Sequence, residues 1–406
     1  IGTVTLHAND VDTDTDIQIG ATAVGASGTL VIDGTTDIDF TGALTGVALS
    51  AGSATGNITI ATVNATTTYT TGSGNDSFTS ATNMNLNITA GTGTDTLVLT
   101  NDDYSASTLT LSGIEVINSA TGVVTLAGSH ATGSSYVFGG ASTFVVTAQS
   151  GTGEVVDLKE TSNAVGMVLN GAAGGDALTG SKSTATTING LGGNDAITGG
   201  AAADTFAGGT GVDTIDISLS GLSVDTISLG SVLLDTDRDT ITGFTAGATN
   251  SDIIQVAVGD TELATAHATA PVMDDDTTIA GAGGGAYTMT GATSINADFV
   301  ILQSGAALNS DASTGGNLAL TTADGLNGTE LLKALSTDTS AYTGITAAAD
   351  ADVGYLIAYQ GGDAYLYHFV EGAGTDLIVA ADIELVGTIK GVAADSLVQA
   401  NFDLIA

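Results

Sequence analysis

A nine-residue repeat near the middle of the chain constrains the fold more than any other feature of the sequence. Three consecutive copies read GLGGNDAIT (190–198), GGAAADTFA (199–207) and GGTGVDTID (208–216). Glycine at the first positions permits tight turns and close approach of the backbone. An apolar residue at the eighth position suits a short strand whose side chain enters a core. Each copy therefore predicts one tight turn followed by one short strand.

Repeats of this length predict a parallel β-roll in which each copy forms half a turn. Equivalent positions then recur every 18 residues, which places Asp195 and Asp213 on one edge of the roll and Asp204 on the opposite edge. GAAGGDALT at 171–179 adds Asp176 close to the first edge, at a spacing of 19.

Weaker copies lie elsewhere in the chain. TGSGNDSFT at 71–79 carries Asp76 and AGTGTDTLV at 90–98 carries Asp95, although each lacks the first glycine. Residues 180–189 read as a degenerate copy with one extra residue and no aspartate.

The charge balance narrows the function. Of 406 residues, 44 are acidic and 5 are basic, so the net charge is −39, which excludes binding to nucleic acid or to an anionic membrane surface. The chain lacks cysteine, so it has no disulfide, zinc-thiolate site or cysteine nucleophile. A hydrophobic content of 43% indicates a folded chain. No run of 18 apolar residues is present, so we expect no membrane-inserted helix.

All but seven of the acidic residues are aspartate, and they accompany 57 glycines. Short carboxylates in tight turns favour a hard cation such as Ca²⁺, with solvation of an acidic surface as the alternative. We expect Ca²⁺ to bind between stacked turns through aspartate carboxylates and backbone carbonyls. The candidate ligands in the central copies are Gly171, Asp176, Gly190, Gly192, Asp195, Gly199, Asp204, Gly208, Gly209, Gly211 and Asp213. Those in the upstream copies are Gly72, Gly74, Asp76, Gly91, Gly93 and Asp95.

The copies at 190–216 resemble the RTX (repeats-in-toxin) family, whose nonapeptide is G-G-x-G-x-D-x-U-x. The stretch Asp239-Thr-Ile-Thr-Gly-Phe244, with Asp252-Ile-Ile254 after it, is similar to the segment that caps RTX rolls in secreted proteins. Asp225-Thr-Ile227 repeats the same Asp-x-Ile pattern. The resemblance covers residues 171–256 well and 65–120 loosely. It implies that Asp225, Asp239 and Asp252 are further Ca²⁺ ligands.

The front of the chain is similar to a subgroup of this family. LTLSGIEVI at 109–117 resembles segments of RTX-bearing bacterial surface-layer proteins, which are long acidic β-solenoids without cysteine. The resemblance implies that the protein is secreted and assembles on a cell surface with Ca²⁺.

Signatures of catalysis are missing from the sequence. The four histidines are far apart, and there is no H-E-x-x-H helix, G-x-S-x-G elbow or Walker-type loop. We therefore expect no enzymatic activity.

We predict an all-β fold with little helix, in three domains. Residues 1–165 form a Thr/Gly-rich β-solenoid-like domain, 166–256 form the roll with its cap, and 257–406 form a β-rich C-terminal domain. GYLIAYQGGDAYLYHF at 354–369 predicts a hairpin that turns at Gly361-Gly362-Asp363, and the best helix candidates are 329–335 and 262–268. The last residues, 401–406, resemble a type I secretion signal or an ordinary final strand.

Other acidic or histidine motifs have a structural and a functional interpretation. The alternating aspartates of 10–16 predict either a Ca²⁺ site outside the EF-hand class or a solvated strand. Asp274–Asp276 predicts an exposed loop, whereas Asp235, Asp237 and Asp239 adjoin the cap of the roll. His368 is expected to pack among aromatic side chains.

These features together predict a secreted, Ca²⁺-dependent structural protein that self-assembles into a cell-surface layer or extracellular filament. Its expected partners are further copies of itself and a cell-surface polysaccharide. Two alternatives are an RTX adhesin or ligand-binding module, and the non-catalytic RTX part of a secreted enzyme. Self-repulsion of the carboxylates predicts that Ca²⁺ acts as a folding switch.

Overall fold

The computed structural model describes residues 2–9, 17–20, and 28–257 apart from 66, 101, 141–142, 150, 152, 164–165 and 230–236. It also describes 272–274, 299–307, 345–346, 353–370, 377–378, and 383–405 apart from 395. The chain divides into two compact units. Unit 1 comprises 1–150, 154–170 and 179–186; unit 2 comprises 151–153, 171–178 and 187–406.

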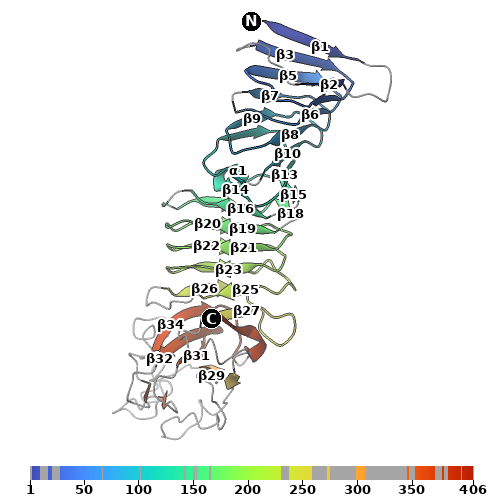
Figure 1. Ribbon diagram of the computed structural model, residues 1–406. Helices are drawn as coiled ribbons and strands as arrows, with labels where there is room; N and C mark the ends of the chain where they lie inside the picture. Colours follow the sequence, from blue (N-terminus) through green and yellow to red (C-terminus); the bar gives the residue numbers. More distant parts are fainter. Residues whose placement is uncertain are drawn as a thin grey trace. The chain divides into compact units, whose positions relative to one another are not determined.

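Unit 1 is a parallel β-solenoid whose consecutive strands alternate between sheets (Figure 1). One sheet has six strands, in the spatial order β1 (Thr3–Ala8), β3 (Gly28–Gly34), β5 (Val47–Ala54), β7 (Thr68–Thr70), β9 (Leu86–Thr89) and β12 (Leu109–Ser112). The other has eight, in the order β18 (Ser162–Asn163), β15 (Val137–Gly140), β13 (Val116–Ser119), β10 (Thr96–Leu99), β8 (Ser77–Ser80), β6 (Ile58–Ile60), β4 (Ile38–Phe40) and β2 (Ile17–Ile19).

Further strands complete unit 1. They are the neighbours β11 (Asp102–Asp103), β14 (Val124–Ala127), β16 (Phe144–Thr147) and β19 (Met167–Asn170), together with β17 (Val155–Asp157). The only α-helix in the described residues is α1 (Gly128–Ala131).

The core of unit 1 is a stack of equivalent apolar residues, because side chains alternate between the two faces of each strand. The register of the eight-stranded sheet aligns Phe40, Ile60, Phe78, Leu97, Ile117 and Phe138 in one column. Each of these side chains is buried. The apolar residues of these strands therefore form one continuous column of side chains inside unit 1.

Unit 2 contains the nine-residue repeats, which form two parallel sheets as predicted. The first has the order β21 (Thr186–Asn189), β23 (Thr205–Ala207), β25 (Thr226–Ser228), β27 (Ile253–Ala257) and β35 (Phe402–Ile405). The second begins with β20 (Ala177–Thr179), β22 (Ala196–Thr198), β24 (Thr214–Asp216) and β26 (Asp239–Thr242). Ile197, Phe206 and Ile215 enter the core, so the eighth position has its predicted role.

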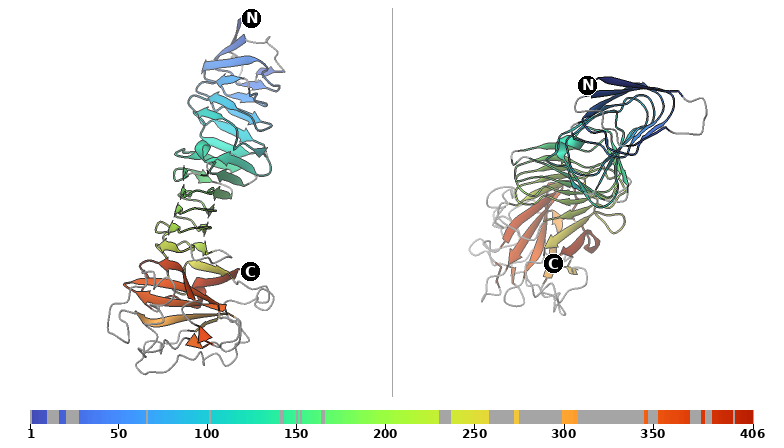
Figure 2. Two further views of the ribbon diagram at one scale, coloured as in Figure 1. Left: turned by 90° about the vertical axis from the view of Figure 1, so that its left-hand side faces the viewer. Right: turned by 45° about the horizontal axis from the view of Figure 1, so that its top comes forward.

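The second sheet of unit 2 continues into C-terminal strands (orange and red in Figure 2). After β26 it has β34 (Ile383–Ile389), β32 (Asp363–Val370), β31 (Val353–Gln360), β29 (Phe299–Ala307) and β28 (Val272–Asp274). β31 and β32 form the predicted antiparallel hairpin, whose turn residues Gly361 and Gly362 both have positive φ. A separate antiparallel pair joins β30 (Ile345–Thr346) to β33 (Leu377–Ile378).

The described residues thus confirm an all-β parallel solenoid with almost no helix. The last residues form the 3₁₀ turn η2 (Gln399–Asn401) and β35, which pairs in parallel with β27. The two helix candidates, 329–335 and 262–268, lie outside the described residues.

Candidate metal-binding turns

Aspartates line one edge of the roll in unit 2, at the entrance to each strand of the second sheet. Asp176, Asp195 and Asp213 immediately precede β20, β22 and β24, and Asp239 begins β26. The Oδ1 atom of each later carboxylate accepts a hydrogen bond from the backbone N–H of the aspartate one turn earlier. The N···O distances are 2.6 Å for Asp176 to Asp195, 2.7 Å for Asp195 to Asp213, and 3.1 Å for Asp213 to Asp239.

The same arrangement occurs at the first sheet of unit 2, where Asp204, Asp225 and Asp252 precede β23, β25 and β27. The N–H of Asp204 donates to Asp225 Oδ1 over 2.8 Å, and that of Asp225 donates to Asp252 Oδ1 over 2.9 Å. The structure therefore places Asp204 in a different ladder from Asp195 and Asp213. It also keeps Asp176 in register despite its spacing of 19.

A third ladder lies in unit 1, at the eight-stranded sheet. The N–H of Ile58 donates to Asp76 Oδ1 and the N–H of Asp76 donates to Asp95 Oδ1, each over 2.7 Å. The N–H of Asp95 donates to Glu115 Oε2 over 2.8 Å. Sequence reasoning missed Glu115, because glutamate does not fit the nonapeptide. Its position directly before the strand β13 was the available signal.

The ladder aspartates are buried in both units. Between 0% and 5% of their surface is exposed. The second carboxyl oxygen is buried without a hydrogen-bond partner in five of them: Asp76, Asp95, Asp195, Asp213 and Asp225. In three others Oδ2 accepts a backbone hydrogen bond: the N–H groups of Ala172, Gly200 and Thr245 donate to Asp176, Asp204 and Asp252, respectively. Buried carboxylates without a counter-charge are costly.

The pKa values of these groups reflect that cost. Burial, with neighbouring carboxylates as a lesser cause, raises the pKa of Asp95 and of Asp195 to about 6. The same causes raise the pKa of Asp225 to about 7 and that of Asp239 to about 8. Burial also raises the pKa values of Asp76, Asp213 and Asp252. Two lysines form ion pairs away from the ladders, Lys159 with Glu160 and Lys390 with Asp363.

Glycines bring backbone oxygens up to the same carboxylates. A Cβ on Gly190 would lie under 3.0 Å from both Asp195 Oδ2 and the carbonyl oxygen of Gly208, and one on Gly208 would meet Asp213 Oδ2 as closely. Gly171 and Gly199 pack against Asp176 Oδ2 and Asp204 Oδ2 in the same way. The first glycine of each copy therefore sits on the carboxylate of its own copy.

The remaining glycines of the repeat stack on carbonyl groups of the neighbouring turn. Gly209 and Gly211 have positive φ, and a Cβ on either would lie under 3.0 Å from the backbone of Leu191 or Gly193. Gly192 is less crowded, with Thr210 Oγ1 at 3.1 Å from its added Cβ. In unit 1, Gly72, Gly74, Gly91 and Gly93 all stack closely on carbonyl oxygens of adjacent turns.

These donors fit a hard cation that is held partly by the main chain. Unpaired carboxyl oxygens and glycine carbonyls at one turn are the oxygen types that Ca²⁺ prefers. In the described part of the chain, no three acidic, histidine or cysteine side chains converge on one point. Backbone oxygens such as that of Gly208, beside Asp195 Oδ2, would therefore have to supply the rest of the coordination shell.

In the degenerate copy at 180–189, hydroxyl groups form the hydrogen bonds that aspartate carboxylates form in the other copies. Ser181 donates its hydroxyl to the carbonyl of Thr161 over 2.9 Å, and its N–H donates to Thr186 Oγ1 over 3.2 Å. Thr186 stands directly before β21 residue Thr187, as Asp204 stands directly before Thr205. This turn carries no carboxylate, its one charged residue, Lys182, is exposed, and the buried hydroxyls of Ser181 and Thr186 form hydrogen bonds.

The other motifs of the sequence are distributed as follows. Asp237 is buried and accepts a hydrogen bond from the N–H of Gly211 over 2.9 Å, whereas Asp235 and residues 10–16 lie outside the described residues. Asp274 ends β28, and Asp275 and Asp276 are not described. The ring of His368 packs 5.2 Å from that of Tyr355, and burial lowers the pKa of His368 to about 4.

The fold and these turns define a parallel β-solenoid with carboxylate ladders along its turns. Comparison with known protein families, with curated proteins and with solved structures found no match. Among the described residues, no helix has the length and apolar character needed to cross a membrane.

Proposed function

We propose that the chain is a secreted structural protein that Ca²⁺ folds and that self-assembles into a cell-surface layer or extracellular filament. One observation carries the proposal: buried, stacked carboxylates whose second oxygens have no partner in five turns. Such groups oppose folding unless a cation neutralises them or they bind protons.

Ca²⁺ would be held by the ladder aspartates and by the glycine carbonyls that pack against them. Binding to the folded chain alone stabilises that state by mass action, so the chain would fold where Ca²⁺ is millimolar and not where it is submicromolar. This difference separates the outside of a cell from its interior, which supports export before folding. The resemblance of 171–256 to RTX proteins agrees with this order of events.

Self-assembly is supported by the repetitive architecture, since a solenoid presents the same surface at every turn. The resemblance of 109–117 to surface-layer proteins points the same way. The proposal assigns the chain no catalytic role. Its partners would be further copies of the chain, with a cell-surface polysaccharide as anchor.

Calcium removal tests the folding step. Circular dichroism of the purified chain should show β signal in millimolar Ca²⁺ and its loss after EGTA is added. Isothermal titration should show Ca²⁺ uptake that falls when Asp195 and Asp213 are both changed to Asn. Asp216→Asn is the matched control, because Asp216 lies at the end of β24 outside the ladders. A spectrum that EGTA leaves unchanged would refute the proposal.

Electron microscopy tests the assembly step. Negative-stain images of the chain in Ca²⁺ should show ordered sheets or fibres that disappear in EGTA. A folded chain that stays monomeric in Ca²⁺ at high concentration would leave the folding switch intact and contradict the structural role.

A further inference from the structure

The helix α1 takes the place of a strand in one turn of unit 1. The strands β11, β14 and β16 are neighbours in one sheet, and the elements that follow them along the chain are β12, α1 and β17. Beside β17, Thr132 Oγ1 donates to the carbonyl of Val155 over 3.3 Å, and the N–H of Gly133 donates to the carbonyl of Asp157 over 2.9 Å. The position of α1 therefore depends on individual hydrogen bonds to its neighbours.

The side chain of His130 ties α1 to the turn before β12. Its Nε2 lies 2.9 Å from the carbonyl oxygen of Ser107, and the backbone N–H of Ala127 donates to its Nδ1 over 3.2 Å. A carbonyl only accepts and an N–H only donates, so these partners require the neutral ring with its hydrogen on Nε2. Ala127 precedes the first residue of α1, and its N–H is thus capped by His130 at the third helical position.

Protonation of the ring removes this cap. The second proton goes to Nδ1, where it faces the N–H of Ala127, so two donors oppose each other and a charge enters a partly buried site. Burial lowers the pKa of His130 from the ordinary 6.5, and the hydrogen bond to the carbonyl of Ser107 opposes that shift. The neutral ring therefore stabilises this turn fully above pH 6.5, and the contribution is lost as the pH falls through the lowered pKa.

The ionisable groups around α1 have partners of their own. The strands β14 and β16, which pack against α1, contain none. Those on the segments that flank β11, β12 and β17 near α1 are Asp102, Asp103, Tyr104, Glu154, Asp157, Lys159 and Glu160. Four of the carboxylates accept hydrogen bonds from backbone N–H groups nearby in the chain, and Glu160 lies 3.9 Å from the Lys159 ammonium. The hydroxyl of Tyr104 lies 3.4 Å from Thr100 Oγ1.

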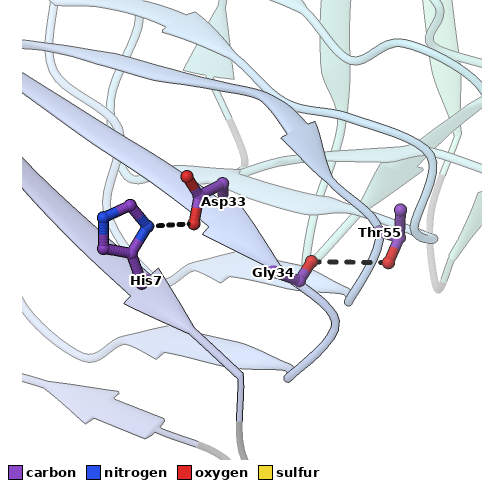
Figure 3. A network of polar contacts seen from close by, with 4 residues as sticks. All are labelled: His7, Asp33, Gly34 and Thr55. Carbon is purple, nitrogen blue, oxygen red and sulfur yellow. Dashed lines mark hydrogen bonds and ion pairs between the residues drawn. The ribbon is translucent and has the colours of Figure 1, made fainter.

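Two other described histidines lack this arrangement. His7 is 68% exposed, and its Nδ1 lies 2.6 Å from Asp33 Oδ1, so the carboxylate compensates the charge that protonation adds (Figure 3). The Nε2 atom of His368 is buried without a hydrogen-bond partner, and burial lowers the pKa of His368 to about 4. Protonation therefore breaks a backbone cap at His130, keeps a contact at His7, and reaches His368 only in stronger acid.

We propose that His130 is an acid-sensitive latch of unit 1, whose neutral ring holds α1 against the turn before β12 and whose protonation at Nδ1 releases the start of the helix. The release is a local opening in a chain that otherwise stays folded, and it requires neither Ca²⁺ nor assembly. The ladder of the same unit responds to acid in the opposite way, because the raised pKa of Asp95, about 6, means that its buried carboxyl group is stabilised by binding a proton.

Ring titration tests the protonation step. Nuclear magnetic resonance of the chain with isotope-labelled histidine is recorded from about pH 8 to about pH 5, a range that brackets the ordinary histidine pKa. The signals of His130, assigned by their loss in His130→Gln, should show the Nε2–H tautomer at the upper end and a pKa below 6.5. An Nδ1–H tautomer, or a pKa of 6.5 or higher, overturns the proposal.

Amide hydrogen exchange tests the release. Relative to the intrinsic exchange rate at each pH, the protection of residues 127–133 should fall on acidification, by about tenfold for each unit by which the pKa of His130 is lowered. The segment around Asp95 should keep or gain protection. In His130→Gln the protection of 127–133 should not depend on pH, because glutamine caps the same N–H and does not titrate.

The wild-type measurements decide the matter even where the glutamine variant fails to fold. Protection of 127–133 that stays constant in the wild type, or that falls equally in a folded His130→Gln variant, overturns the latch. Neither result bears on the proposed Ca²⁺-dependent folding, which EGTA tests separately.

Discussion

The backbone N–H of Asp195 donates a hydrogen bond to Oδ1 of Asp213, 2.7 Å away, while Oδ2 of that same carboxylate is buried without a partner. Oδ1 therefore stabilises the fold through a hydrogen bond, whereas Oδ2 has no partner within the protein. Substitutions that keep the hydrogen bond but remove the negative charge separate the effect of the hydrogen bond on stability from that of the charge.

Asp195→Asn and Asp195→Ala should differ in a way that depends on Ca²⁺. Asparagine can still accept the hydrogen bond from the N–H of Asp176 and removes a buried charge, so its melting temperature should exceed that of the wild type without Ca²⁺ and fall below it with Ca²⁺. Alanine leaves the buried N–H unpaired, at a cost of about 1–3 kcal/mol in both conditions. Thermal unfolding with and without EGTA measures this. Equal melting temperatures for the two variants in both conditions would contradict the different roles of the two carboxyl oxygens.

Without Ca²⁺, the free energy of unfolding should increase as the pH falls. The folded-state pKa values of Asp195, Asp225 and Asp239 are raised to about 6, 7 and 8, above the ordinary value of 3.8. The folded state therefore binds more protons, so this contribution is fully present below pH 3.8 and is lost as the pH rises toward 8. Urea unfolding in metal-free buffer between pH 4 and 8, roughly this window, should show the trend. A double Asp225→Asn, Asp239→Asn variant should flatten it.

Gly190→Ala should destabilise the roll by about 1–3 kcal/mol, as overpacking of a filled interior does. The added methyl group would lie under 3.0 Å from Asp195 Oδ2 and from the carbonyl of Gly208, and so would also occupy the candidate cation position. Gly20→Ala is the control, because nothing lies within 4 Å of a Cβ at that position. Equal melting temperatures for the two variants in Ca²⁺ would show that the turn accommodates a methyl group at position 190, and would contradict the prediction.

Phe206→Ala should cost about 3–5 kcal/mol, since the side chain is wholly buried and its removal leaves a cavity. The change leaves every ladder carboxylate in place, so Ca²⁺ stoichiometry in the folded variant should be unchanged. Leu222→Ala removes a side chain that is 81% exposed and should change stability by less than about 0.5 kcal/mol. Chemical denaturation in Ca²⁺ compares the two variants.

The sequence predicted the roll well because the nine-residue period of the repeat is the length of one strand and one turn. Nine residues are one strand with one turn, so Asp195 and Asp204 had to lie in different ladders, and the structure places them there. The hairpin of β31 and β32 was also predictable, from the adjacent glycines at its turn and the tyrosine-rich strands on either side.

Other features could not be predicted from the sequence, because they depend on residues that do not belong to the nine-residue repeat. Glu115 takes a ladder position with a longer side chain and a different sequence context. In the six-stranded sheet, the column of residues that runs from Thr5 through Ser50 to Ser112 becomes visible only once the register aligns positions that are 19 to 26 residues apart in the sequence. The joining of β34 to β26 connects residues that are more than a hundred positions apart, beyond any local pattern.

The three carboxylate ladders have a direction. At every rung the amide belongs to the earlier turn and the carboxylate that completes it belongs to the later one. Each turn therefore lacks a full set of backbone hydrogen bonds until the turn after it is in place. A chain truncated within a ladder would leave the amide of its last aspartate without this acceptor, so shortening the chain from its C-terminal side affects the remaining end of a ladder in a way that shortening from the N-terminal side does not.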